Sequence, residues 1–431
     1  MDSPYQPLPG FRDFAPRDRL LSRYLFEAWT RVATRYGFSE YEAPILERAA
    51  LYLKKSGGEL SGQLFRFTDK GDRDVVLRPE LTASLARIVA DQQRDYAKPL
   101  KWFEIGRCFR YEKPQRGRLR EFYQFNADIM GETSVGADAE LIALSIDVMR
   151  ELGFQPGEFV VRLSDREAWA TFCRENGVAA GQLDAFLQIV DKIERDPEVK
   201  LRERLQAFGL ELETIREFIA SPDTSRSENL AAVLADLETR GLAQFAEIDL
   251  SIVRGLAYYT GVVFEVFDAS KALRSVAGGG RYDSLISIIT DGSTDLAATG
   301  YAMGDCVITE LINETPQALA QFVAWRQRQA TCDVYVIIAD DSKRPEAIRL
   351  VNALRESGLG ADYPLSPTKI NKQFKGADQT LARFAIVVGS EYPELQLKNL
   401  NARTEESIAP NADPIEILKI RLTEPDGPLL T

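Results

Sequence analysis

Histidine is absent from all 431 residues of this chain. This absence excludes nucleophilic catalysis by Ser-His-Asp or Cys-His arrangements, and it excludes every metal site built on imidazole. If the chain is an enzyme, its chemistry must rest on carboxylates, arginines and the positioning of its substrates.

Cysteine and long apolar runs are also scarce. The four cysteines lack CxxC spacing, which predicts reduced thiols and no metal site; they are Cys108, Cys173, Cys306 and Cys332. No run of about 20 apolar residues occurs, so we expect no membrane span. The opening segment MDSPYQPLPGFRDF lacks a basic region followed by an apolar core, so no signal peptide is expected. Together these features predict a cytoplasmic protein.

The net charge of −12 is not typical of a nucleic-acid-binding protein, but the basic residues are unevenly distributed. One cluster lies within residues 107–120 and holds Arg107, Arg110, Lys113, Arg116, Arg118 and Arg120 against Glu112 alone. A second cluster holds Lys369, Lys372, Lys375 and Arg383 against Asp378. Local patches of this kind can bind phosphate groups. For the second cluster, a solvated face is an equally good interpretation.

Residues 102–131 alternate with a period of two, which predicts two strands joined by the first basic cluster. In the second strand, Gln124, Asn126 and Asp128 alternate with apolar residues. A hairpin with one apolar face and one hydrogen-bonding face is suited to bind a polar ligand, and its arginine-rich loop favours a phosphate.

The mass of 48.3 kDa is sufficient for two or three domains. Helical spacing over residues 16–36 predicts an amphipathic helix, and a helix is also expected over residues 81–95. Charged helical segments dominate residues 165–245. A glycine-rich turn is expected before Arg281, and residues 315–330 resemble a linker. Beyond the linker, strand and helix patterns alternate, which predicts a small α/β domain.

Several ordered segments resemble the histidyl-tRNA synthetases, which belong to the class II aminoacyl-tRNA synthetases. FRYEKPQRGRLREFYQF resembles motif 2 of the class, and YGFSEYEAPILE resembles motif 1. IVRGLAYYTG and GGGRYD resemble the two signature peptides of the family, and VLRPELT its acidic strand end. KINKQFKGADQTLARFAIVVG resembles its C-terminal anticodon-binding domain. The resemblance covers nearly the whole chain.

This resemblance implies an α+β fold with an antiparallel-sheet catalytic core. The catalytic domain would span residues 1–325, with a helical insertion at about 168–245. An α/β anticodon-binding domain would span residues 331–425. The implied activity is the ATP-dependent ligation of L-histidine to tRNA(His) through a histidyl-adenylate.

The same resemblance implies roles for individual residues. Arg110 and Arg254 would be catalytic residues at the α-phosphate. ATP would contact Arg110, Glu112, Arg120 and Arg281. Histidine would contact Glu80, Thr82, Gln124, Asp128, Arg254, Tyr258, Tyr259 and Tyr282. The tRNA would contact Gln115, Arg116, Lys369, Lys372 and Lys375. Mg²⁺ is expected with ATP, and a homodimer is expected through motif 1.

Three positions depart from the family pattern. Val307 stands where motif 3 usually carries an arginine, so either Arg281 or an arginine of the motif 2 loop is expected to replace it, or ATP binds differently. Ala257 stands where Asp is common. Asp128 stands where many members carry Glu, so its reach is shorter.

Two alternatives to a synthetase remain open. One is a non-catalytic paralogue such as the regulatory subunit of ATP phosphoribosyltransferase, and the other is a tRNA-binding sensor module. The missing histidines likewise allow two explanations. A histidine-free enzyme that charges histidine could still be made during histidine starvation, or the absence could reflect drift.

Overall fold

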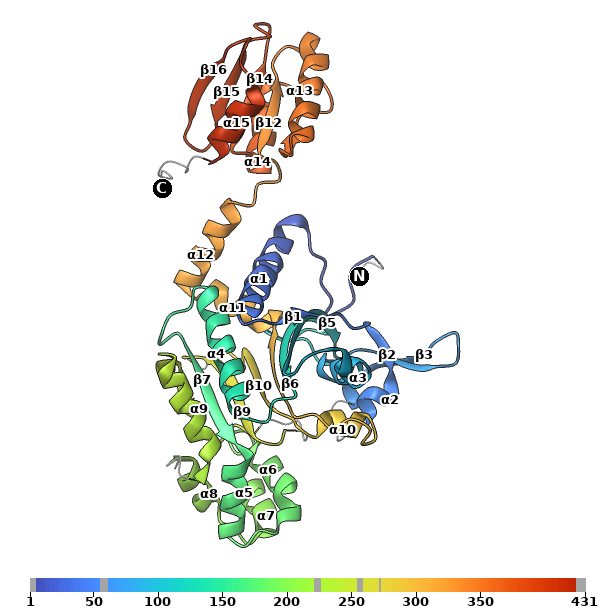
Figure 1. Cartoon of the computed structure of the whole chain (residues 1–431), viewed down its shortest axis with the longest axis vertical. Coiled ribbons are helices and arrows are strands. Elements are labelled where there is room, and N and C mark those ends of the chain that lie inside the picture. Colours follow the sequence, from blue (N-terminus) through green and yellow to red (C-terminus); the bar gives the residue numbers. More distant parts are fainter. Residues whose placement is uncertain (1–4, 55–60, 221–225, 254–258, 271–272, 424–431) are drawn as a thin grey trace. The chain divides into compact units, whose positions relative to one another are not determined.

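The computed structural model describes residues 5–54, 61–220, 226–253, 259–270 and 273–423. The chain divides into two compact units, Met1–Phe322 and Val323–Thr431 (Figure 1). Within the described ranges, no helix is both long and apolar enough to cross a membrane.

An eight-stranded sheet forms the centre of the first unit (Figure 1). Neighbouring strands are antiparallel except at the two margins, where β1 pairs with β5 and β7 pairs with β8 in parallel. In spatial order the strands are β1 (Ser39–Glu40), β5 (Leu100–Phe109), β6 (Glu121–Met130), β11 (Ala298–Gly304), β10 (Ala277–Arg281), β9 (Val262–Asp268), β7 (Phe159–Asp165) and β8 (Ala246–Ile248). The predicted antiparallel core is therefore confirmed.

Strands β5 and β6 form the predicted hairpin, with Phe109 opposite Glu121 next to the basic loop. The polar face of β6 carries Gln124, Asn126 and Asp128. On the other face, Phe125 stacks on Trp29 of α1 (Pro16–Arg35), with ring centroids 5.5 Å apart. The alternation in the sequence thus separates a ligand-facing side from a core-facing side.

Helices α1 and α4 (Gly136–Glu151) pack against each other, and α4 also packs against β6 and β11. The predicted helix over 16–36 corresponds to α1. The hydroxyl of Tyr36 donates to Asp147 Oδ2 at 2.7 Å and links the two helices.

A smaller antiparallel sheet precedes the hairpin in sequence. Its strands, in spatial order, are β2 (Leu46–Arg48), β4 (Asp74–Leu77) and β3 (Phe65–Thr68). Helix α3 (Thr82–Gln92) confirms the helix predicted there and packs against α2 (Ala49–Leu53) and α10 (Leu285–Ile289).

The predicted helical region contains α5 (Arg166–Glu175), α6 (Leu183–Val190), α7 (Glu198–Gln206), α8 (Leu212–Ala220) and α9 (Glu228–Thr239). Aromatic side chains form its core. Trp169 lies 4.8 Å from Phe218, and Phe172 lies 4.5 Å from Phe218, measured between ring centroids. These helices therefore have an apolar core of their own.

Two segments of the first unit and its boundary have a secondary structure that was not predicted. The expected glycine-rich turn is the fully buried strand β10, because its glycines allow neighbouring strands to approach closely. A Cβ at Gly279 would lie 2.8 Å from Phe264 Cζ and would overlap the backbone of Gly300. The expected linker over residues 315–330 does contain the boundary between the two units, after Phe322, but it is helical. Its helix, α12 (Pro316–Gln327), begins with a proline in its first turn.

The second unit confirms the predicted α/β domain. Its sheet has the order β13 (Ala361–Asp362), β12 (Val334–Ile338), β14 (Phe384–Val388), β15 (Leu395–Asn399) and β16 (Thr404–Ile408). The first three strands are parallel and the last two are antiparallel. Its helices are α13 (Arg344–Glu356), α14 (Ile370–Thr380) and α15 (Pro414–Thr423).

Candidate active site

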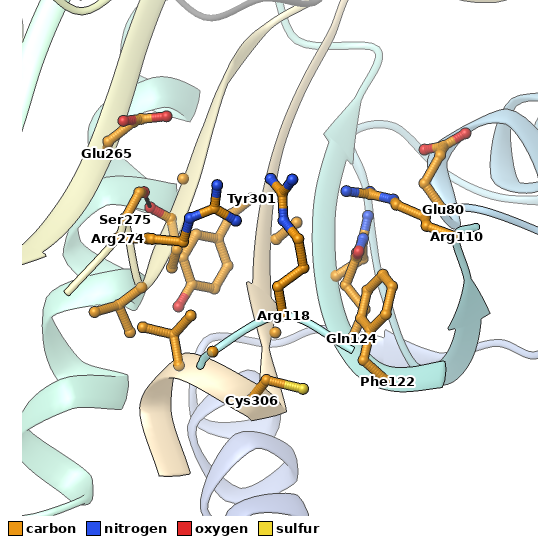
Figure 2. A pocket seen from close by; sticks show the side chains of 18 of the residues that line it. Glu80, Arg110, Arg118, Phe122, Gln124, Glu265, Arg274, Ser275, Tyr301 and Cys306 are labelled. Carbon is orange, nitrogen blue, oxygen red and sulfur yellow. Dashed lines mark hydrogen bonds between the residues drawn. The ribbon is translucent and has the colours of Figure 1, made fainter. Parts of the chain in front are cut away.

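A pocket of about 860 Å³ lies over the polar face of β6 and the adjoining strands β9, β10 and β11. The start of α3, the basic loop and the start of α11 (Asp305–Glu314) complete its wall. Figure 2 shows Glu80 and Arg110 at one side of the pocket, Arg118 in the middle, and Arg274 with Glu265 at the other side. The pocket therefore carries an acidic side chain at each side, and arginines extend across it between them.

The buried carboxylate of Glu80 lies at the N-terminus of α3. Its two oxygens accept hydrogen bonds from the backbone nitrogens of Thr82 at 2.8 Å and Ala83 at 2.9 Å. These donors and the positive end of the helix dipole stabilise the anion where water is scarce. A carboxylate held in this way can accept an ammonium group of a ligand.

Polar groups continue from Glu80 along β6. Asn126 donates from Nδ2 to Thr82 Oγ1 at 3.2 Å, and Gln124 donates from Nε2 to Asn126 Oδ1 at 2.6 Å. Thr82, Gln124 and Asn126 all line the pocket and are buried. The three side chains thus hold one another in fixed orientations beside Glu80.

Deeper in the pocket, the hydroxyl of Tyr282 donates to Asp128 Oδ1 at 2.5 Å. Both side chains are almost completely buried, and Tyr259 lines the same wall. Gly300 makes this pair possible, because a Cβ there would overlap the Asp128 carboxylate and lie 2.8 Å from Tyr282 Cε1. The pair offers a buried acceptor and a hydroxyl to a polar ring.

A buried ion pair supports the floor below this end. Arg78 donates from NH1 to Glu104 Oε1 at 2.6 Å and from Nε to the carbonyl of Arg107 at 2.8 Å. Burial raises the pKa of Glu104 despite the opposing effect of Arg78. Gly106 leaves the space that this pair occupies, since a Cβ there would lie 2.8 Å from Glu104 Oε1. Removing either partner would leave an uncompensated charge in the core.

Arg110 lies where β5 leads into the basic loop. Its Nε donates to the carbonyl of Pro79 at 2.9 Å, and its guanidinium carbon lies 5.2 Å from the ring centroid of Phe122. Among the described residues, no acid forms an ion pair with Arg110. Its remaining donors are available to a ligand, and Figure 2 shows the side chain directed into the pocket.

The basic loop itself is a tight turn. Gln115 and Arg118 exchange backbone hydrogen bonds of 3.0 and 2.9 Å, and Gly117 adopts a φ of 70° between them. Within the loop, Arg118 Nε lies 2.6 Å from Glu112 Oε2, and both residues line the pocket. The turn therefore directs Arg118 inward.

Two predicted ATP ligands do not line the pocket. Arg120 Nε donates to the carbonyl of Glu112 at 3.0 Å, and its guanidinium carbon lies 4.2 Å from the ring centroid of Tyr111. Arg281 donates from NH2 to Asp138 Oδ2 at 2.6 Å and to the carbonyl of Ser134 at 2.9 Å. Arg281 is therefore paired with an acid within the chain, whereas Arg120 is held by a backbone carbonyl and an aromatic ring outside the pocket.

Burial and attraction compete in the pair of Arg281 with Asp138. For Asp138, burial outweighs the attraction of Arg281 and raises the pKa of the carboxyl. For Arg281, burial alone would lower the pKa, but Asp138 and Asp283 raise it. This pairing ties β10 to α4, so the arginine has a structural role.

Helix α11 begins at the pocket with Asp305, Cys306 and Val307. Asp305 is buried, and its carboxylate lies 2.7 Å from Arg12 NH2 and accepts from the backbone of Tyr123 at 2.9 Å. Burial raises the pKa of the Cys306 thiol, and Asp305 raises it further. The first turn of α11 therefore brings no positive charge to the pocket.

Three functional candidates were missed by reasoning from sequence, namely the pocket-lining residues Arg195, Arg274 and Glu265. Arg195 follows α6 and Arg274 precedes β10, so about 80 positions separate them along the chain. No local pattern marks such residues. Only the fold brings them together.

Seven predicted site residues either lie outside the described residues or do not line the pocket. Arg254 and Tyr258 lie outside the described residues. Arg116 is exposed and pairs with Glu310 at 3.1 Å and with Glu314. The adjacent Gln115 is also exposed, as are the three predicted lysines Lys369, Lys372 and Lys375 on and before α14.

Known proteins resemble the chain over most of its length. The family model "Histidyl-tRNA synthetase" matches residues 10–305, and the model "Anticodon binding domain" matches residues 333–412. The histidine–tRNA ligase of Opitutus terrae is 39% identical over 94% of this chain and 96% of its own length. The chloroplastic/mitochondrial histidine–tRNA ligase of Arabidopsis thaliana is 36% identical over 89% of this chain and 80% of its own length.

A solved structure shares the same fold. The histidyl-tRNA synthetase of Nostoc sp. superposes with a TM-score of 0.78, covering 97% of this chain and all of that chain at 23% identity. At this identity, the likeness concerns the fold alone.

Proposed function

Because the chain belongs to the histidyl-tRNA synthetase family, we propose that its pocket activates L-histidine with ATP and then transfers the histidyl group to tRNA(His). The chain is a histidine–tRNA ligase of class II. The observation that carries the proposal is the joining of two buried carboxylates, Glu80 and Asp128, to a row of arginines in one cavity.

The acidic end suits histidine. Glu80, with Thr82 and Gln124 beside it, would bind the α-ammonium group. Asp128 and Tyr282 would bind the two ring nitrogens, and Tyr259 would close the wall. A buried site that pairs both ring nitrogens rejects apolar amino acids by about 10⁴-fold, because its polar groups would otherwise be left unpaired.

The first reaction step needs no general base. A carboxylate oxygen of histidine forms a bond to the α-phosphorus of ATP, the bond from that phosphorus to the β-phosphate oxygen breaks, and pyrophosphate leaves with the electron pair. Arg110 would neutralise charge on the α-phosphate, because a guanidinium stays charged and binds phosphate through two donors. Arg254 would assist, as the family resemblance implies.

The adenine has a site near the basic loop. Glu112 would accept from its amino group, and the ring of Phe122 offers an apolar face for stacking. Mg²⁺ would enter with ATP as part of the substrate.

In the second step, a terminal hydroxyl of tRNA(His) attacks the carbonyl carbon of the histidyl group, and AMP leaves. The adenylate phosphate can accept the released proton, so this step needs no histidine side chain either. Gln115 and Arg116 would contact the acceptor end. Once the tRNA is bound, Arg116 would exchange its carboxylate partners on α11 for phosphate.

The second unit would bind the anticodon stem through three exposed lysines, namely Lys369 just before α14 and Lys372 and Lys375 within it. Replacing all three by alanine should lower the slope of log Kd against log salt concentration by about 2 to 3, because each lost phosphate contact removes about 0.7 to 0.9. An unchanged slope would contradict this part of the proposal.

We also propose a homodimer through the motif 1 region. The region around β2 and β3 exposes large apolar side chains, namely Ile45, Leu46, Leu53 and Phe67. Exposed apolar side chains on a small sheet are typical of a covered interface. We also propose that the protein is located in the cytoplasm. Sedimentation equilibrium of wild-type protein and of Phe67→Glu tests the interface; an undisturbed dimer in the variant would contradict it.

The paralogue and sensor alternatives have less support. The curated relatives are named histidine–tRNA ligases, and the anticodon-binding model matches the second unit. Pyrophosphate exchange with each of the twenty amino acids distinguishes the three proposed functions, since only the synthetase shows exchange that depends on histidine.

Arg254→Ala should abolish that exchange without unfolding the protein. Wild-type exchange in this variant would refute the role of Arg254.

A further inference from the structure

Three arginines line the pocket between its middle and the side that holds Arg274. Arg118 comes from the basic loop, Arg195 from the turn after α6, and Arg274 from the segment before β10. In the view of Figure 2, the guanidinium groups of Arg274, Arg118 and Arg110 lie in a row across the pocket. A row of cations along one wall is suited to an extended anion.

Within the described part of the chain, ion pairing balances the charge of only one of these arginines. Arg118 pairs with Glu112, but among the described residues neither Arg195 nor Arg274 forms an ion pair. Burial lowers the pKa of Arg274, and the positive charges of Arg118 and Arg195 lower it further. Repulsion among the three side chains is therefore present in the free protein, and a bound anion would relieve it.

Hydrogen bonds hold the backbone on both sides of Arg274. Asp268, which is buried at the end of β9, accepts from the backbone of Leu273 at 2.8 Å and from Ser270 Oγ at 2.6 Å. On the other side, Ser275 Oγ donates to the carbonyl of Ala277 at 2.8 Å. Hydrogen bonds of its two chain neighbours, Leu273 and Ser275, thus fix the backbone from which Arg274 enters the pocket.

The neighbouring wall supplies no competing cation. Val307 and Cys306 of α11 line the pocket there, and neither carries a positive charge. Val307 occupies the position at which the sequence comparison with class II motif 3 leads one to expect arginine. The positive charge at this end therefore comes from elsewhere in the fold.

We propose that Arg195 and Arg274, together with Arg118, form the subsite for the β- and γ-phosphates of ATP and for the pyrophosphate that leaves. The inference rests on the proposed function and extends it to two residues outside the class II motifs. As the bond between the α-phosphorus and the bridging oxygen breaks, negative charge grows on pyrophosphate, and this cluster stabilises it.

Arg274→Met and Arg195→Met test the proposal, because methionine keeps an unbranched side chain and removes the charge. For each variant, the KM for ATP and the KM for pyrophosphate should rise about tenfold, as expected for one charge-assisted hydrogen bond to phosphate. The Kd for a non-hydrolysable histidyl-adenylate analogue should stay within about twofold of the wild-type value, since the analogue lacks both outer phosphates.

Two further variants sharpen the comparison. Arg274→Lys keeps the charge and should recover most of the affinity for ATP. Arg174→Met is the matched control, because Arg174 is exposed on α5 and contacts Thr171 at 3.1 Å, and it should change none of these constants. Melting temperatures of all variants verify that they fold.

The outcomes separate the inference from the proposed function. If wild-type protein lacks histidine-dependent exchange, the proposed function fails. If wild-type protein exchanges but both methionine variants keep the wild-type KM for ATP and for pyrophosphate, the inference alone is overturned. Equal weakening of ATP and of the adenylate analogue also overturns it, because a polyphosphate subsite cannot contact the analogue.

Discussion

Tyr282→Phe removes one hydroxyl from the floor of the histidine end and leaves the ring in place. That hydroxyl donates to Asp128 Oδ1 at 2.5 Å, and only 2% of Tyr282 is exposed to solvent. A hydrogen bond to a charged group contributes about 1.5 to 3 kcal/mol when its loss leaves the partner buried. We therefore expect the KM for histidine to rise about 10- to 150-fold.

Tyr36→Phe is the matched control for this variant. Tyr36 also donates to an aspartate, Asp147, at 2.7 Å, but this bond joins α1 to α4 and does not line the pocket. Both variants should lower the free energy of unfolding by about 1.5 to 3 kcal/mol, because each removes a hydrogen bond to a carboxylate. Only Tyr282→Phe should change the KM for histidine.

Histidine-dependent pyrophosphate exchange at saturating ATP measures this KM, and urea unfolding measures stability. The KM for ATP should stay near the wild-type value in Tyr282→Phe, because the phosphates bind at the other end of the pocket. If both tyrosine variants had the same KM for histidine, the Asp128–Tyr282 pair would not recognise the ring.

Three other perturbations have outcomes set by the structure. Gly300→Ala places a methyl group against Asp128, so histidine-dependent exchange should fall at least 100-fold, which corresponds to about 2.7 kcal/mol. Pyrophosphate binding, measured by calorimetry, should persist in this variant. Unimpaired exchange would refute the close approach of Gly300 to Asp128. Asp138→Ala leaves the guanidinium of Arg281 buried without its partner carboxylate. The free energy of unfolding, measured in urea, should therefore fall by about 3 kcal/mol. A decrease of less than about 1 kcal/mol would show that the pair has little structural role. Burial raises the pKa of Cys108 to about 12, so at pH 8 its thiolate fraction is far below that of a thiol in the unfolded chain. Iodoacetamide should therefore label Cys108 only in urea, as measured by mass spectrometry. Rapid labelling of the native protein would contradict this burial.

Much of the fold and one wall of the site could be predicted because local sequence patterns determine them. The period of two in β5 and β6 separates Gln124, Asn126 and Asp128 from the core, and the structure places all three in the pocket. The helix before motif 1 and the α/β character of the second unit likewise follow from patterns within single elements.

Other features could not be predicted because they depend on contacts between distant segments. The glycines before Arg281 belong to a buried strand, since their lack of side chains admits Gly300 and Phe264, which lie elsewhere in the sequence. Arg281 itself pairs with Asp138 of α4, a helix that was not expected. The cluster with Arg274 depends on the helical region and on β10 meeting at one pocket.

A crystal structure with ATP and histidinol, which lacks the reacting carboxylate, tests the central claim most directly. The account predicts the imidazole between Asp128 and Tyr282, the amine at Glu80, and the α-phosphate within hydrogen-bond distance of Arg110. A structure in which the imidazole lies away from Asp128, or in which Arg110 makes no contact with the triphosphate, would contradict it.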